Sequence, residues 1–98
     1  MYSIETGGDA LGYSVEMRQD DNVLLQEYYF WAFQDDGIQL YKQNGNPSYV
    51  GLFFQSHLQP DAADQVLRKY VRHQVNTWRD SLEDQGIEAH VIDNLELF

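Results

Sequence analysis

The chain has 98 residues, of which 16 are acidic and only 6 are basic, and 14% of its residues are aromatic. Its formal net charge of −10 disfavours direct binding to nucleic acid or to an anionic membrane and favours a protein partner with a basic surface. The absence of cysteine excludes disulfide bonds, thiolate metal sites and cysteine nucleophiles. Because 43% of the residues are hydrophobic, we expect a single folded domain over residues 1–98, with the charge on its surface.

The N-terminal third of the chain predicts two strands after a loose start. Residues 1–10 are polar and rich in glycine, so we expect a loose lead-in there. Apolar and polar residues alternate over 11–18, which is typical of a half-buried strand, and 19–22 has the composition of a turn. Residues 24–33 are rich in aromatic side chains and predict a long second strand.

Two more strands follow, each separated from the previous one by a turn signal. Asp36 and Gly37 favour a hairpin turn before a strand over 38–43. The run Asn44–Pro47 predicts a second turn, and 48–55 predicts a fourth strand.

The hydrophobic period then changes to that of a helix. Pro60 suits the first helical turn, apolar residues recur at helical spacing to about residue 85, and Gly86 is a natural C-terminal cap. Alternation over 87–91 predicts a closing strand. We therefore predict an α+β fold, an antiparallel β-meander of four to five strands packed against one long helix in the C-terminal half.

No motif specifies a reaction. The histidines His57, His73 and His90 fall in different predicted elements and share no metal-ligand spacing. The aspartates of the turns are explained by turn formation, and no nucleophile–base arrangement can be defended. We therefore expect no enzymatic activity, no cofactor and no metal. The N-terminus lacks a signal-peptide pattern and no apolar run is long enough to span a membrane, so we expect a cytoplasmic protein.

The aromatic segment 28–33 predicts a partner-binding patch. Alternate residues of a strand point to opposite faces, and one helix covers only one face of a sheet. We assign Tyr28 and Phe30 to the helix side, which leaves the opposite aromatic residues in water. The residues predicted to form this patch are Tyr29, Trp31, Phe33 and Tyr41. The alternative is a strongly curled sheet that closes this face into a core.

The topology also predicts that acidic residues gather at the two ends of the molecule. The end that we expect to contact a partner contains Asp20, Asp21, Asp80, Glu83 and Asp84. The other end contains Asp35, Asp36, Asp61 and Asp64. The alternative for both ends is a solvated surface charge that keeps the protein soluble.

The basic residues Arg68, Arg72 and Arg79 fall on a narrow stripe beside the apolar side of the predicted helix. We expect this stripe to form salt bridges with neighbouring acids such as Asp64 rather than to bind an anion.

These observations favour a small, acidic, non-catalytic protein-binding module that inhibits or regulates a partner. Its carboxylates would bind Lys or Arg of the partner, and its aromatic residues would anchor the interface. Mimicry of nucleic-acid charge is the sharper form of this hypothesis. In size and charge the chain is similar to phage anti-CRISPR and anti-restriction proteins and to toxin-immunity proteins, a similarity of composition that assigns no residue. One alternative is a self-associating assembly protein with an aromatic homodimer interface. The other is a small enzyme or ligand carrier with an aromatic pocket.

Overall fold

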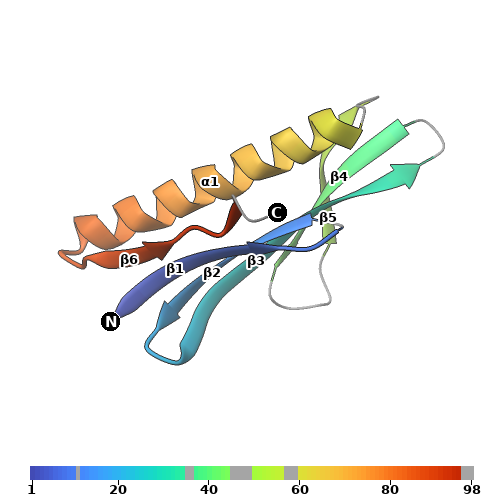
Figure 1. The fold of residues 1–98 in the computed structure, drawn as a ribbon. Helices are drawn as coiled ribbons and strands as arrows, with labels where there is room; N and C mark the ends of the chain where they lie inside the picture. The colour runs from blue at the N-terminus through green and yellow to red at the C-terminus, as the bar shows by residue number, and fades with distance from the viewer. Residues whose placement is uncertain (11, 35–36, 45–49, 57–59, 96–98) are drawn as a thin grey trace.

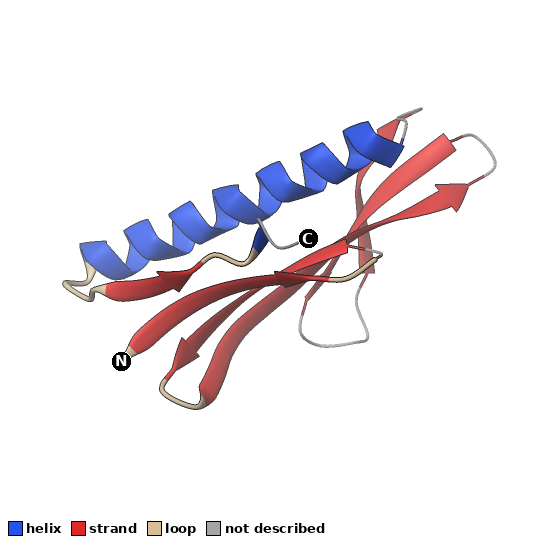
Figure 2. Cartoon of the chain, viewed as in Figure 1, coloured by secondary structure: helices blue, strands red, loops and turns tan. Residues whose placement is uncertain are grey.

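The computed structural model describes residues 1–10, 12–34, 37–44, 50–56 and 60–95, and for 34, 37, 44 and 50–56 it describes the backbone alone. In chain order the elements are β1 (Tyr2–Gly8), β2 (Gly12–Gln19), β3 (Asn22–Gln34), β4 (Gly37–Asn44), β5 (Val50–Ser56), α1 (Pro60–Asp84) and β6 (Ala89–Ile92). One layer of strands lies against one long helix, so the predicted α+β fold is confirmed (Figures 1 and 2).

The sheet is mixed and has the strand order β5-β4-β3-β2-β1-β6. The first five strands form an antiparallel meander, of which the sequence predicted β2–β5. The chain then crosses one face of the sheet as α1 and returns at the opposite edge, where β6 pairs parallel with β1 (Figure 1). The predicted turns at Asp36 and at 45–47, like Leu11, lie outside the described residues.

The expected loose lead-in at residues 1–10 is wrong. Residues Tyr2–Gly8 form β1, which lies inside the sheet between β2 and β6. Ile4 and Thr6 point toward α1 and are almost completely buried. A strand with only one aliphatic core residue and two glycines gives a weak alternation signal, which explains why the sequence pattern missed it.

The helix begins and ends where the sequence predicted. Pro60 occupies its first position, and Gly86 follows it with a positive φ of 77°. The amide of Ile87 donates to the carbonyl of Leu82, and the amide of Gly86 donates to the carbonyl of Glu83. These two hydrogen bonds form a Schellman motif, which satisfies carbonyls at the end of α1 and turns the chain toward β6.

The core lies between α1 and the sheet. The inward side of the helix contributes Ala63, Leu67, Val71, Val75, Trp78 and Leu82. These residues pack on strand residues such as Ile4, Val15 and Leu40, all of which are inaccessible to solvent. Burial of each large aliphatic side chain contributes about 1.5–3 kcal/mol relative to exposure, so this single layer holds the helix on the sheet.

Candidate functional site

The aromatic segment of β3 faces the helix in the opposite way to our expectation. Tyr29 is buried beneath α1, and its ring stacks on that of Tyr70 with the centroids 6.5 Å apart. Its hydroxyl donates to Glu27 Oε1 at 2.8 Å, and Gln74 of α1 donates to the same oxygen at 2.7 Å. Burial, together with the hydrogen bond to Glu27, raises the pKa of Tyr29 above its usual range. The assignment of Tyr29 to the uncovered face is therefore wrong.

Trp31 and Phe33 lie on the same side of β3 as Tyr29. Trp31 is partly buried and packs against the core, so its placement on the uncovered face is also wrong. Phe33 is 69% exposed and meets the Trp31 ring edge-on, with the centroids 5.2 Å apart. The exposure predicted for Phe33 is confirmed, although it belongs to the helix side of the sheet.

The uncovered face carries a different group of aromatic residues. Tyr28 stacks on Phe30 with the ring centroids 5.4 Å apart, and Phe30 stacks on its cross-strand partner Tyr41 at 5.3 Å. We call these three residues the aromatic row. Only Tyr41 among them was predicted for this face. All three side chains are partly exposed, and no described element lies over them.

Hydrogen bonds fix the two tyrosines of the aromatic row. The hydroxyl of Tyr28 donates to Asp9 Oδ1 at 2.9 Å, and the hydroxyl of Tyr41 donates to Gln39 Oε1 at 3.0 Å. Partial burial, followed by the bond to Asp9, raises the pKa of Tyr28 to about 12. The Tyr28 phenol therefore stays neutral at physiological pH, and the row presents a largely apolar surface.

The neighbouring part of the same face is acidic. Glu5 and Glu16 are cross-strand partners on β1 and β2, and Arg18 binds Glu16. Both carboxylates line a shallow depression whose floor contains Gly7 and Gly8. The uncovered face thus changes from aromatic over β3 and β4 to carboxylate-lined over β1 and β2.

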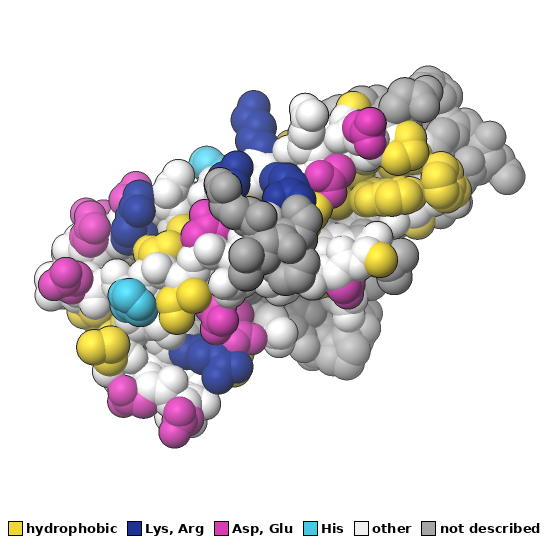
Figure 3. Space-filling view, viewed as in Figure 1, with side chains coloured by type: hydrophobic (Ala, Val, Ile, Leu, Met, Phe, Trp, Pro, Cys, Tyr) yellow, Lys and Arg dark blue, Asp and Glu magenta, His cyan; other side chains and the backbone are white. Residues whose placement is uncertain are grey.

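The acidic end predicted from the topology exists. The β2–β3 turn, with Asp20 and Asp21, and the C-terminal end of α1 lie at the same end of the long axis of the molecule (Figure 1). Its five acidic residues are all exposed: Asp20, Asp21, Asp80, Glu83 and Asp84. In the space-filling view, acidic side chains gather at this end (Figure 3). Asp20 Oδ1 binds the N-terminal amine at 2.7 Å, an exposed ion pair of small energetic value.

Of the residues predicted for the other acidic end, the structure describes Asp61 and Asp64 alone, and these two do not form a comparable surface. Asp64 binds Arg68 at 2.9 Å and accepts a hydrogen bond from the Tyr13 hydroxyl, so its charge is compensated locally. Asp61 is exposed in the first turn of α1, where the helix dipole favours an acid. Asp35 and Asp36 lie outside the described residues.

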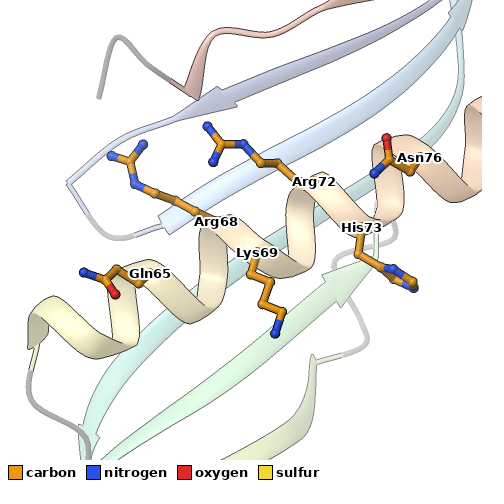
Figure 4. Close-up of a pocket in the computed structure, with 6 residues that line it drawn as sticks. All are labelled: Gln65, Arg68, Lys69, Arg72, His73 and Asn76. Atoms are coloured by element: carbon orange, nitrogen blue, oxygen red, sulfur yellow. The ribbon is translucent and has the colours of Figure 1, made fainter.

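Within the basic stripe of α1, Arg68 contacts the C-terminal segment. Arg68 donates to the carbonyl oxygen of Leu95 at 2.6 Å, and its guanidinium lies 4.7 Å from the centre of the Tyr13 ring. The preferred interpretation, salt bridging, is confirmed for Arg68 through its contact with Asp64. In Figure 4, Arg68 and Arg72 point to one side of the helix and Lys69 to the other. All three cations line one pocket beside α1.

The remaining chemistry-bearing residues form no centre within the described parts of the chain. His73 and His90 lie on different elements and are exposed, and His57 is outside the described residues. No group of three or more potential metal-ligating side chains occurs among the residues described. Within the described parts of the chain, α1 is too polar to span a membrane.

Comparison with known proteins adds no relative. No protein-family model, no curated protein and no solved structure matches this chain.

Proposed function

We propose that this protein is a non-catalytic protein-binding module that inhibits or regulates its partner, and that it docks through the face of the sheet opposite α1. The observation that carries the proposal is the aromatic row of Tyr28, Phe30 and Tyr41 on that uncovered face. Stacked rings offer a large contact area at a low cost in side-chain entropy, which is why aromatic residues anchor many interfaces.

The charge distribution supports a basic partner. Glu5 and Glu16 flank the aromatic row on the same face, and the acidic end adds five exposed carboxylates. Carboxylates around an apolar centre attract Lys and Arg from a distance and form the polar rim of the interface. A partner that normally binds nucleic acid has such a basic surface, so mimicry of nucleic-acid charge is the specific form of this proposal.

Capture from lysate of the native host by the immobilised protein tests the proposal. We expect a captured protein that is lost when Phe30→Ala and Tyr41→Ala are combined and that is released by salt. Phe33→Ala is the matched control, because it removes an exposed ring from the other side of β3. Circular dichroism must show that each variant is folded.

Two outcomes contradict the proposal. Equal capture by the wild type and the double variant would show that the aromatic row is not the docking surface. A stable dimer in sedimentation, dissociated by the double variant, would instead identify the row as a homodimer interface, the alternative predicted from the sequence.

A further inference from the structure

The first five residues of β3 extend beyond the strand that pairs with it on one side. Pairing between β3 and β4 begins at Glu27, which lies opposite Asn44. Among the described residues, 22–26 pair only with β2, through contacts such as Asn22 with Gln19 and Leu25 with Met17. Within the described parts of the chain, the other edge of this segment is open, and its backbone donors and acceptors can pair with an added strand. We call residues 22–26 the β3 extension.

The β3 extension is also unusually apolar for an exposed strand. Val23, Leu24 and Leu25 are 47%, 45% and 46% exposed, respectively, and none of them belongs to the core. By contrast Met17, the cross-strand partner of Leu25, is only 7% exposed. The hydrophobic core between α1 and the sheet therefore includes Met17 of β2 but does not include the β3 extension.

Exposed strand edges normally carry features that prevent pairing with other chains. The β3 extension contains no Lys, Arg or Pro, which are the residues that most often block an edge. Its single irregularity is a β-bulge, because Val23 pairs with Arg18 and Leu25 with Met17, which leaves Leu24 as the extra residue. An apolar edge with so little protection is typical of a site where a strand is added.

We propose that the β3 extension is a strand-addition site for an extended apolar segment of a partner protein, flanked by Lys or Arg. This inference rests on the proposed protein-binding function and specifies how a partner segment docks. Backbone hydrogen bonds to the open edge supply affinity, and side chains of the added strand pack on Val23, Leu24 and Leu25. The site lies on a different part of β3 from the aromatic row.

The charge around the site determines the chemistry of the added segment. Asp20 and Asp21 directly precede the β3 extension, and the acidic C-terminal end of α1 lies at the same end of the molecule (Figures 1 and 3). Of the cations described nearby, Arg18 is bound to Glu16 and the N-terminal amine to Asp20. The local field is therefore negative and favours a basic segment.

The same charges disfavour a second copy of this chain as the occupant. Two chains of net charge −10 repel each other at long range, which disfavours close pairing of two copies.

A synthetic peptide that alternates Val and Thr, with a pair of Lys at each end, provides the probe. Binding is followed through the amide signals of the isotope-labelled full-length protein and through their hydrogen exchange. We expect shifts and slowed exchange centred on residues 22–26. The same peptide with alternate amides N-methylated should not bind, because it cannot form the ladder, and a peptide with Glu in place of Lys should bind at least about tenfold more weakly.

Variants of the protein make the test specific. Leu24→Lys places a charge on the open edge and should weaken binding at least about tenfold. Phe33→Lys is the matched control, because it makes the same charge change at an exposed site on β3 outside the β3 extension. Unfolding curves establish that both variants are folded.

Several results would overturn the inference. They are the absence of binding at millimolar peptide, shifts confined to the aromatic row, equal affinity for the N-methylated peptide, or equal affinity of the Leu24→Lys variant. A wild-type dimer in sedimentation that Leu24→Lys dissociates would assign the edge to a second copy instead. Each of these results leaves the lysate capture that depends on Phe30 and Tyr41 intact, so failure of the strand-addition site and failure of the proposed function are distinguishable.

Discussion

At Gly12 the backbones of β2 and β3 approach too closely for any side chain. A Cβ atom at this position would lie 2.1 Å from the carbonyl oxygen of Tyr29 and 2.8 Å from the Cα atom of Phe30. These are backbone atoms of the strand that carries the aromatic row, so they cannot move without disturbing the β2–β3 ladder.

We predict that Gly12→Ala lowers the free energy of unfolding by about 1–3 kcal/mol, as overpacking does. Urea denaturation measures the change. Gly7→Ala is the control, because its Cβ would contact only the Ser14 hydroxyl, at 3.1 Å, and that side chain can rotate. Equal losses for the two variants would contradict the steric explanation.

The raised pKa of Tyr28 predicts a loss of stability in alkali. Its folded-state pKa is about 12, against 10.0 for an unperturbed tyrosine, so the native protein holds this proton more tightly than the unfolded chain does. The stability linked to this proton, through burial of the phenol and its bond to Asp9, is therefore complete below about pH 10 and is lost as the pH rises toward 12.

Urea unfolding at pH 9, 10 and 11 checks this prediction. Tyr28→Phe should reduce the pH dependence of the free energy of unfolding over this range, because phenylalanine has no proton to lose. An identical pH dependence in the wild type and the variant would show that the hydrogen bond to Asp9 does not contribute.

The orientation of Glu27 shows why a local pattern does not decide which aromatic face of β3 is inside. A charged residue in a strand is expected to point to solvent, which places Tyr28 and Phe30 inside. In the structure, Glu27 points toward α1, where Lys42 Nζ lies 2.9 Å from its Oε2 and both Gln74 and Tyr29 bind Oε1. These tertiary partners compensate for the cost of partly burying the carboxylate, and no local sequence pattern predicts them.

At the scale of elements, the turn at residues 19–22 and the helix were predictable because their signals are local. The proline and glycine at the ends of α1 fix its bounds through backbone chemistry alone. In contrast, β1 lies between β2 and β6, the second of which is far away in the sequence, and its own residues give little indication of a strand. The exposure of Val23–Leu25 could not be predicted from the sequence either. It arises because β4 and α1 do not extend over this segment, and not from the identity of the three residues.

The junction of β1 with the segment after β6 depends on one buried hydroxyl. Thr6 Oγ1 accepts from the amide of Asn94 at 2.8 Å and donates to Asp93 Oδ1 at 3.1 Å. Thr6 is only 2% exposed, so loss of its hydroxyl leaves the Asn94 amide without this acceptor. These bonds position Leu95, which is wholly buried in the core.

We predict that Thr6→Val, which conserves the shape of the side chain, lowers the free energy of unfolding by about 1–3 kcal/mol. Hydrogen exchange should show earlier opening of β6 than of β2. Thr77→Val is the control, because the hydroxyl of Thr77 donates to a carbonyl on the exposed surface of α1. A stability loss no larger than that of the control would contradict this role for Thr6.

At the scale of the whole molecule, the protein is asymmetric in two directions. Across the sheet, α1 covers one face, and the aromatic row lies on the other. Along the long axis, exposed acidic residues gather at one end. The final turn of α1 lies at this end and contains no basic residue, although the helix dipole favours a cation there. This arrangement costs a few tenths of a kcal/mol per acid, a cost that an electrostatic role in binding would explain.

The acidic end is predicted to accelerate association with a basic partner. The combination of Asp80→Asn, Glu83→Gln and Asp84→Asn should leave the protein folded, with equal or slightly higher stability, since it removes like charges near the C-terminal end of α1. The same change should slow association of the Lys-flanked peptide by about three- to tenfold at low salt and flatten its salt dependence, because steering follows the local field. Stopped-flow fluorescence with a labelled peptide measures both effects.

Asp61→Asn, at the opposite end of α1, controls for the loss of an exposed acid. If the folded triple variant associates as fast as the wild type at low salt, the acidic end does not steer binding, and the β3 extension and the aromatic row must recognise their partner by contact alone.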